Sequence, residues 1–296
     1  MKTIKIVLAS VFLMFFSMIK AQSSADTQTL LWKISGKGLQ QESYILLTTT
    51  KTCESKIKLS DKVLNILNKV KLIAPETGLN SKAYAGVAEK ANGLKNNNQS
   101  AEKTLSKNTY EKLITVAEDE GIPEIYLNQY KLWYIYMFLM TKTYQCNVPN
   151  VEKIDDVIRN YGAKHNIPVK ELLSIDETLN TFYDKFPNSY WESILSYIVN
   201  NKNRVITDID VKAGFYKQEN VAGLKKLLTS SGLFKLRYAA TDAEMYRIRL
   251  IMLRIENTIK VQSTLITLDI VDIGNDLTSI FNFLSKSGYN ISPVIN

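Results

Sequence analysis

The sequence predicts an α+β fold in which strands cluster near the two ends of the chain and helices fill the middle. Two observations support this prediction. Short apolar runs rich in β-branched residues occur near both ends, and apolar residues follow helical spacing through most of the region between them. No internal repeat of the length typical of solenoid proteins is visible.

The N-terminal region is expected to hold a strand pair, a helix and a third strand. Gly36 and Gly38 lie between the first two strands and favour a tight turn. Ser60 is a suitable N-cap for the helix, because its hydroxyl can accept a hydrogen bond from the first turn. Glu76 ends the third strand. These three strands are predicted at residues 30–34, 44–48 and 72–77.

The middle of the chain is predicted to be almost entirely helical. One helix contains the run WYIYMFLM, which is apolar enough to be buried on nearly every side; a ligand pocket is the alternative. A short interruption is expected near Gly214, and the segment IPVKELL carries a strand. The helices are predicted at residues 108–121, 125–143, 151–165, 176–186, 190–228 and 242–261.

The C-terminal region returns to strands. β-branched residues dominate the stretch STLITLDIV, which predicts a strand over 263–271, and DIGND then makes a turn. A helix is expected at 278–287 and a last strand at 289–294.

Residues 1–21 have the pattern of a secretory signal peptide. Lysines near the start precede an apolar run, and the segment closes at Ala21 with Gln22 after it. The apolar run is shorter than the roughly 20 residues that a membrane span needs, although an uncleaved anchor is the alternative. We therefore expect cleavage near Ala21, export to the periplasm or the medium, and no stable transmembrane segment in the mature chain.

Composition argues for a packed globule without a nucleic-acid partner. Hydrophobic residues make up 45% of the chain, which is typical of a folded domain rather than of disorder. The formal net charge is +8, and removal of the three lysines of the signal segment lowers it to +5. This excess is spread over many lysines, without a basic run or a basic stripe interleaved with aromatic residues.

The two cysteines of the chain, Cys53 and Cys146, are predicted to form a disulfide. Two cysteines in an exported protein pair more often than they stay free. Such a bridge would stabilise the fold by roughly 4–5 kcal/mol in the chain-entropy model.

Few other residues offer catalytic or ligating chemistry. His165, the one histidine, lies in YGAKHNIP and is by default a solvated loop residue. No GxSxG, P-loop or dinucleotide motif is present, so no organic cofactor is expected. Glu76, Asp272 and Asp276 could hold a hard cation through oxygen ligands. The alternative is that the aspartates form turns and that Glu76 takes a backbone or lysine partner.

Several segments together resemble the TraB/GumN family, whose members are relatives of the Tiki metalloproteases. The opening LLWKISGKGLQQESYILLTT is similar to the family's Leu-Leu-Trp strand, its Gly-Lys-Gly-Leu turn and the strand that follows. The likeness continues through LIAPET, LLSIDETLNTFYDKFP, AGFYKQENVAGLKKLL and MYRIRLIMLRIENTIK to FNFLSKSGYNISPV. It implies one domain over 22–296, with a mixed sheet formed by the N- and C-terminal segments, flanking helices and a metal site at the strand ends.

The resemblance further implies that two Gly-x-x-His motifs and a glutamate form the metal site of a peptidase-type hydrolase. Glu76 matches that glutamate, and Arg247 matches the arginine of a Glu-Arg-Asn motif on the late helix. The first Gly-x-x-His falls on residues 47–50. Leu47 therefore stands where the glycine is expected, and Thr50 stands where the histidine is expected.

The second Gly-x-x-His falls on Gly274 and Asn275, so an asparagine occupies the histidine position. Tyr246 replaces the glutamate that precedes the arginine in the late helix. A threonine hydroxyl and an asparagine amide are much poorer ligands for a transition metal than imidazole. The fold can persist without the chemistry.

These departures favour a degenerate relative without catalytic activity or a cofactor. It would bind an unidentified peptide, protein or envelope component at the positions that replace the motif. The alternative is an active metal-dependent hydrolase of the peptidase type, with a divalent metal in an oxygen-rich site formed by Glu76, Asp272, Asn275 and Asp276. A third class is a structural or interaction protein that uses other surfaces.

Overall fold

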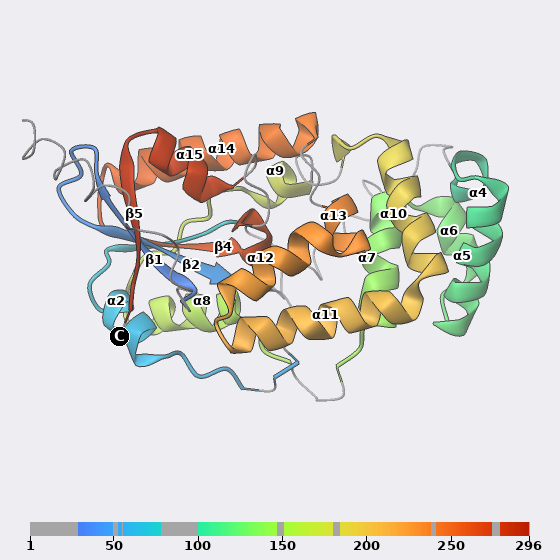
Figure 1. Ribbon diagram of the computed structural model, residues 1–296, viewed down its shortest axis with the longest axis horizontal. Coiled ribbons are helices and arrows are strands. Elements are labelled where there is room, and N and C mark those ends of the chain that lie inside the picture. The colour runs from blue at the N-terminus through green and yellow to red at the C-terminus, as the bar shows by residue number, and fades with distance from the viewer. Residues whose placement is uncertain are drawn as a thin grey trace, which may run out of the picture.

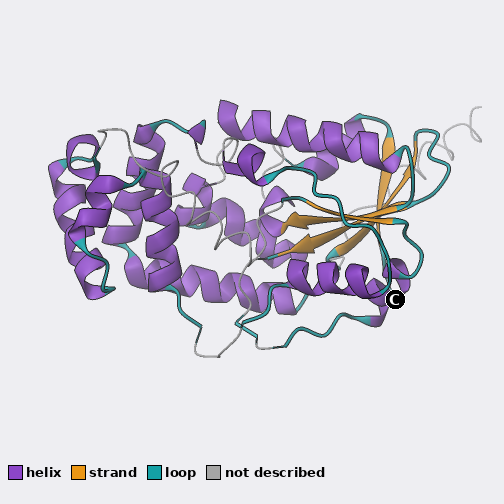
Figure 2. Cartoon of the chain, turned by 180° about the vertical axis from the view of Figure 1, so that it is seen from behind, coloured by secondary structure: helices purple, strands orange, loops and turns teal. Residues whose placement is uncertain are grey.

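A mixed five-stranded sheet lies at one end of an elongated molecule, and helices extend from it to the other end (Figure 1). The view from behind in Figure 2 also shows the strands at one end only. The predicted α+β architecture, with a sheet formed by both chain ends and a helix-rich middle, is confirmed. The computed structural model describes residues 29–49, 53–54, 56–77, 100–146, 151–179, 184–237, 241–273 and 279–295.

The sheet has the strand order β3-β4-β2-β1-β5. Its first strand pairs antiparallel with β2 and β5, whereas β4 pairs in parallel with β2 and β3. Because β2, β3 and β4 run in the same direction, their C-terminal ends lie together at one end of the strands, which we call the carboxyl edge of the sheet. The strands are β1 (Leu31–Gly36), β2 (Ser43–Thr48), β3 (Leu72–Pro75), β4 (Thr264–Asp269) and β5 (Tyr289–Pro293).

The helices pack around this sheet and then around one another. Apolar residues at helical spacing give α5 a buried face that includes Leu113 and Ala117, and the Ser106 hydroxyl accepts a hydrogen bond from the Thr109 N–H at its start. The helices before β4 are α2 (Asp61–Leu67), α4 (Ala101–Thr104), α5 (Lys107–Asp119), α6 (Glu124–Gln129), α7 (Leu132–Thr143), α8 (Ile154–Lys164), α9 (Ile175–Leu179), α10 (Asn188–Asn200), α11 (Lys202–Lys217), α12 (Val221–Ser230), α13 (Gly232–Arg237) and α14 (Asp242–Ile259). A 3₁₀-helix, η4 (Ile270–Ile273), and α15 (Ile280–Lys286) follow β4.

Several predicted elements differ from the structure. The helix expected over 125–143 is divided into α6 and α7, because Tyr130 and Lys131 have extended backbones. The interruption expected near Gly214 is absent, since α11 runs through this residue without a break. The strand expected over 263–271 ends earlier, at Asp269, and continues as η4.

The segment IPVKELL forms no regular strand. It runs beside β3 and makes only isolated bridges, between Ile73 and Val169 and between Thr77 and Leu173. The β3 strand is thereby covered at the edge of the sheet, because its Ile73 N–H donates to the Pro168 carbonyl over 2.9 Å. Ser60 lies at the N-cap of α2 as predicted, but its side chain makes no capping hydrogen bond.

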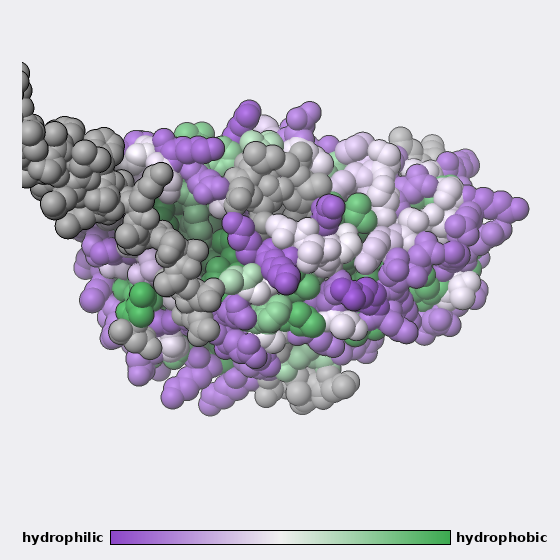
Figure 3. Space-filling model, viewed as in Figure 1, coloured by the Kyte–Doolittle hydropathy of each residue, from purple (hydrophilic) through white to green (hydrophobic). Residues whose placement is uncertain are grey.

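Cys53 and Cys146 form a disulfide with a Cα–Cα distance of 5.2 Å. The bridge ties the segment after β2 to the segment after α7, so it connects the sheet with the helical region. On the face shown in Figure 3, hydrophilic side chains predominate and apolar atoms appear in separate small areas. No helix in the described part of the chain has the length and apolar content needed to cross a membrane.

Candidate functional site

The carboxyl edge of the sheet brings together residues from distant parts of the sequence. Thr48 at the end of β2 is paired with Asp269 at the end of β4. Glu76 follows β3 directly, and its N–H donates to the Thr267 carbonyl over 2.8 Å. Helix α14 adds Arg247 to the same place, where the guanidinium bonds to the Glu76 carboxylate. We call Glu76, Glu244, Arg247 and Asp272 the Arg247 cluster.

Arg247 is the centre of this cluster. Its side chain is 1% exposed and contacts three carboxylates, each of which is also buried. One guanidinium nitrogen lies 2.9 Å from Glu76 Oε1, and another lies 2.5 Å from both Glu244 Oε1 and Asp272 Oδ1. Glu244 also accepts a hydrogen bond from Arg247 Nε over 3.0 Å, so this pair is bidentate.

The local sequence explains why Glu244 faces Arg247. The two residues are three positions apart on α14, which places their side chains on the same face of the helix. Thr241 caps the helix by accepting a hydrogen bond from the Glu244 N–H over 3.1 Å. Glu244 belongs to no motif that the sequence shows. Its spacing from Arg247 is the signal that could have identified it.

Glu76 has both carboxylate oxygens engaged. Oε1 accepts from Arg247, and Oε2 accepts from the Asp269 N–H over 3.1 Å. Burial raises the pKa of Glu76 well above its ordinary value, and the neighbouring Asp272 adds to this rise while Arg247 opposes it. Glu76 thus has the backbone partner that the alternative interpretation expected, and an arginine rather than a lysine is its charged partner.

Asp272 is the least satisfied member of the Arg247 cluster. Its Oδ1 contacts Arg247, but its buried Oδ2 has no hydrogen-bond partner among the described residues. Burial raises the pKa of Asp272 to about 6, although Arg247 acts in the opposite direction. Three carboxylates share one guanidinium, so a proton on one of them reduces the excess of negative charge.

A further carboxylate, Asp155 on α8, approaches the same edge of the sheet. Its Oδ1 accepts a hydrogen bond from the Thr267 hydroxyl. Burial raises the pKa of Asp155, and hydrogen bonds with Thr267 and Thr48 act in the opposite direction. Asp155 does not stand out in the sequence, because an acidic residue in the first turn of a helix is common for purely local electrostatic reasons.

The other predicted site residues lie in different environments. The Leu47 side chain is fully buried in the core, and its carbonyl accepts a hydrogen bond from the Tyr216 hydroxyl over 3.1 Å. Tyr246 is 46% exposed on α14, and Lys185 Nζ lies 3.9 Å from the centre of its ring. His165 is exposed, as its default interpretation has it, and stacks on the Tyr161 ring at the end of α8. The remaining predicted positions, Thr50, Gly274, Asn275 and Asp276, lie outside the described residues.

A model of the TraB/PrgY/gumN family matches residues 30–266. The match covers most of the chain, so the protein belongs to the TraB/PrgY/gumN family. This membership agrees with the resemblance carried by the strand, turn and helix segments. Neither the curated proteins nor the solved structures contain a significant match to the chain.

The family's motif positions at Thr50, Gly274 and Asn275 lie outside the described residues, so only the rest of the site can be compared with a metal centre. No three histidine, cysteine, aspartate or glutamate side chains in the described ranges are placed so that they could hold a metal ion. Glu76 already bonds to Arg247 and to a backbone N–H. The guanidinium therefore provides the positive charge for these carboxylates.

Proposed function

We propose that this protein is an exported, non-catalytic member of its family that binds a peptide, protein or envelope component at the carboxyl edge of the sheet. The arrangement of Glu76 is the observation that supports this proposal best. Its two oxygens hold a buried guanidinium and the Asp269 N–H. A metal ion at this carboxylate would have to share it with the Arg247 guanidinium, whose positive charge disfavours a second cation beside it.

Polar groups with unused hydrogen-bonding capacity support a binding role for the same edge. In the described part of the chain, neither the buried Thr49 hydroxyl nor Asp272 Oδ2 has a hydrogen-bond partner. Buried polar atoms without partners are uncommon in native proteins, because they lose the hydrogen bonds that water would provide. The N–H groups of an extended peptide could donate to these oxygens only after the groups that cover them move, because Thr49 is 2% exposed and Asp272 is 3% exposed.

The non-catalytic part of the proposal is tested with the mature protein and metal ions. The protein is titrated with one equivalent of Mn²⁺, Co²⁺ or Zn²⁺, separated from free metal by gel filtration, and analysed for bound metal. We expect neither stoichiometric retention nor metal-dependent cleavage of a fluorogenic peptide library. Stoichiometric binding that is lost in Glu76→Gln but kept in the surface control Glu177→Gln would instead support an active metal-dependent hydrolase.

The binding part is tested with a library of random decapeptides that is incubated with the mature protein and analysed by mass spectrometry of the retained peptides. Thr49→Val and Asp269→Asn change polar groups at the carboxyl edge and should reduce retention. Lys107→Ala is the control, because this side chain is 90% exposed on α5. Retention that is unchanged by both edge substitutions contradicts a peptide site at this edge.

Export is tested by the mass of the N-terminal peptide of the protein recovered outside the cytoplasm. We expect this peptide to begin at Gln22, because cleavage near Ala21 follows from the signal-peptide pattern. An intact Met1 in the recovered protein would contradict cleavage and favour the uncleaved anchor.

A further inference from the structure

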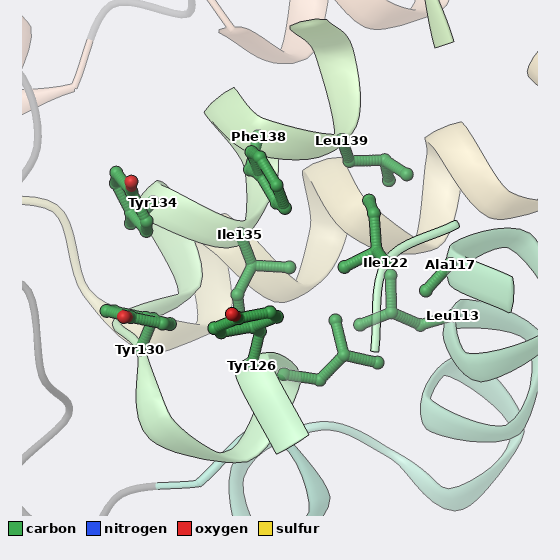
Figure 4. Close-up of a pocket in the computed structure, with 10 residues that line it drawn as sticks. Leu113, Ala117, Ile122, Tyr126, Tyr130, Tyr134, Ile135, Phe138 and Leu139 are labelled. Carbon is green, nitrogen blue, oxygen red and sulfur yellow. The ribbon is translucent and has the colours of Figure 1, made fainter. Parts of the chain in front are cut away.

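An apolar cavity lies in the helical region, between α5, α6 and α7 (Figure 4). Its volume is about 230 Å³. These helices lie at the end of the molecule opposite the sheet, so the cavity is separate from the Arg247 cluster (Figure 1). Its lining residues are Leu113, Ala117, Ile122, Tyr126, Leu127, Tyr130, Tyr134, Ile135, Phe138 and Leu139.

The lining has two chemically different parts. The aliphatic residues are buried and form the floor of the cavity, whereas the aromatic residues are partly exposed and form a rim. In Figure 4 the rim rings lie on one side of the cavity and Leu113, Ala117 and Leu139 on the other. The division of the predicted 125–143 helix creates this arrangement, because the rim residues come from α6, the break after it, and α7.

The rim is a closed ring of four aromatic side chains. Tyr126 contacts Tyr130 and Phe138, with centroid distances of 5.7 and 6.5 Å. Tyr134 contacts the same two residues, with centroid distances of 5.1 and 6.4 Å. Rings at these separations stabilise one another and hold their faces in a defined arrangement.

The cavity is large enough to hold a small molecule. Protein interiors are packed closely, and space without partner atoms loses the dispersion contacts of its lining. An apolar cavity of about 150 Å³ is already large enough to stay dry and to accept benzene. A cavity of about 230 Å³ therefore has room for one or two rings.

The chemistry of the lining indicates an uncharged ligand with a small polar group. Its hydrogen-bonding side chains are tyrosines, and burial raises the pKa of Tyr134, with the nearby Tyr130 adding to the rise, so the Tyr134 hydroxyl stays neutral. Among the described residues, no hydrogen bond to the Tyr126, Tyr130 or Tyr134 hydroxyl is present. Lys142 lies over Phe138 at 5.9 Å but is outside the lining.

We propose that this cavity binds a small uncharged aromatic molecule of one or two rings. The rings occupy the space between the aliphatic floor and the aromatic rim, and the rim hydroxyls hydrogen-bond to the polar group of the ligand. A charged ligand would lose its hydration on entry without gaining an ion pair from the lining.

The test uses indole as the probe and the mature protein in isothermal titration calorimetry. We expect saturable binding to one site and a rise in Tm with indole concentration, because a ligand that binds only the folded state stabilises it. Indole-3-carboxylate, which adds a negative charge, should bind about tenfold more weakly or worse. Absence of saturable indole binding, or tighter binding of the carboxylate, would overturn the proposal.

Ala117→Leu locates the site, because the larger side chain fills the cavity from α5. It should abolish indole binding, whereas Ala163→Leu on the exposed face of α8 should leave it unchanged. Binding that survives in folded Ala117→Leu places the ligand elsewhere and contradicts the proposal. Should Ala117→Leu fail to fold, methyl NMR on the wild-type protein decides the question. Indole must then shift the methyl signals of Ile122, Ile135 and Leu139, and unchanged signals contradict the proposal.

Discussion

Arg247 and Glu76 are 171 positions apart in the sequence, and their side chains meet over 2.9 Å in the interior of the protein. The contact joins α14 to the end of β3. Arg247 is 1% exposed and Glu76 is 5% exposed, so neither charge is stabilised by water. Each depends on the other and on the neighbouring Glu244 and Asp272, so the cluster couples a helix from the late part of the chain to the early part of the sheet.

Arg247→Met should therefore strongly destabilise the protein. The substitution leaves three buried carboxylates without their common partner, a change that typically costs about 3–5 kcal/mol. Urea denaturation of the wild type and the variant gives the difference in the free energy of unfolding.

Arg254→Met provides a matched control on the same helix. Arg254 pairs with Glu177 over 2.8 Å, but the two side chains are 44% and 36% exposed. Exposed ion pairs contribute about 0–1 kcal/mol, so this variant should lose little stability. Similar losses for the two variants would mean that Arg247 does not act as a buried charge partner.

The pH dependence of stability should reveal Asp272. Its pKa is raised from 3.8 to about 6 in the folded protein, mainly by burial. At a pH below 3.8, the Asp272 carboxyl is protonated in both the folded and the unfolded protein. Between pH 3.8 and about 6, it is protonated mainly in the folded protein. The stability that this proton contributes is thus fully present at a pH below the unfolded-state pKa, and it is lost as the pH rises through the folded-state pKa of about 6.

Asp272→Asn removes this titration. From pH 4 to pH 7, we expect the stability of the variant relative to the wild type to increase by on the order of 3 kcal/mol. The measurement is urea denaturation at intervals across this range. A relative stability that stays constant or moves in favour of the wild type would contradict a raised pKa at Asp272.

Much of the sheet was predictable because its strands carry local signals. The run from Leu72 is apolar and ends on Glu76, and the structure places Glu76 directly after β3, at the edge of the sheet. The pairing of β2 with β4 depends on residues more than 200 positions apart. No local pattern encodes this pairing, and only the family resemblance indicated it.

The contents of the site were harder to predict, because they depend on tertiary contacts. Asp155 is an ordinary acidic residue in the first turn of a helix until packing places it near Thr267. The Glu244–Arg247 pair is local to α14, but only packing adds Glu76 and Asp272 to it. The break after α6 was missed for a similar reason. Tyr130 and Lys131 are neither glycine nor proline, and packing rather than intrinsic preference makes them extended.

Reduction of the Cys53–Cys146 disulfide should lower stability substantially. The bridge connects residues 93 positions apart, and in the chain-entropy model a loop of this size is worth roughly 4–5 kcal/mol. Urea denaturation with and without dithiothreitol measures the loss. The Cys53→Ser/Cys146→Ser double variant should be about as stable as the reduced wild type and should not respond to the reductant. A free-thiol count of two on the unfolded, unreduced protein would show that the bridge does not form.

Two helical glycines should respond in opposite directions to substitution by alanine. A Cβ at Gly162 on α8 would lie 2.7 Å from Ile73 Cδ1 and 3.2 Å from the Ile167 carbonyl, so Gly162→Ala forces the buried Ile73 side chain or α8 itself to shift. Such overpacking typically costs about 1–3 kcal/mol.

A Cβ at Gly214 on α11 would meet no atom within 4 Å, so Gly214→Ala should stabilise the protein by about 1 kcal/mol through helix propensity. Thermal and urea denaturation of both variants test the signs, and a gain in stability for Gly162→Ala would show that α8 does not pack closely against β3.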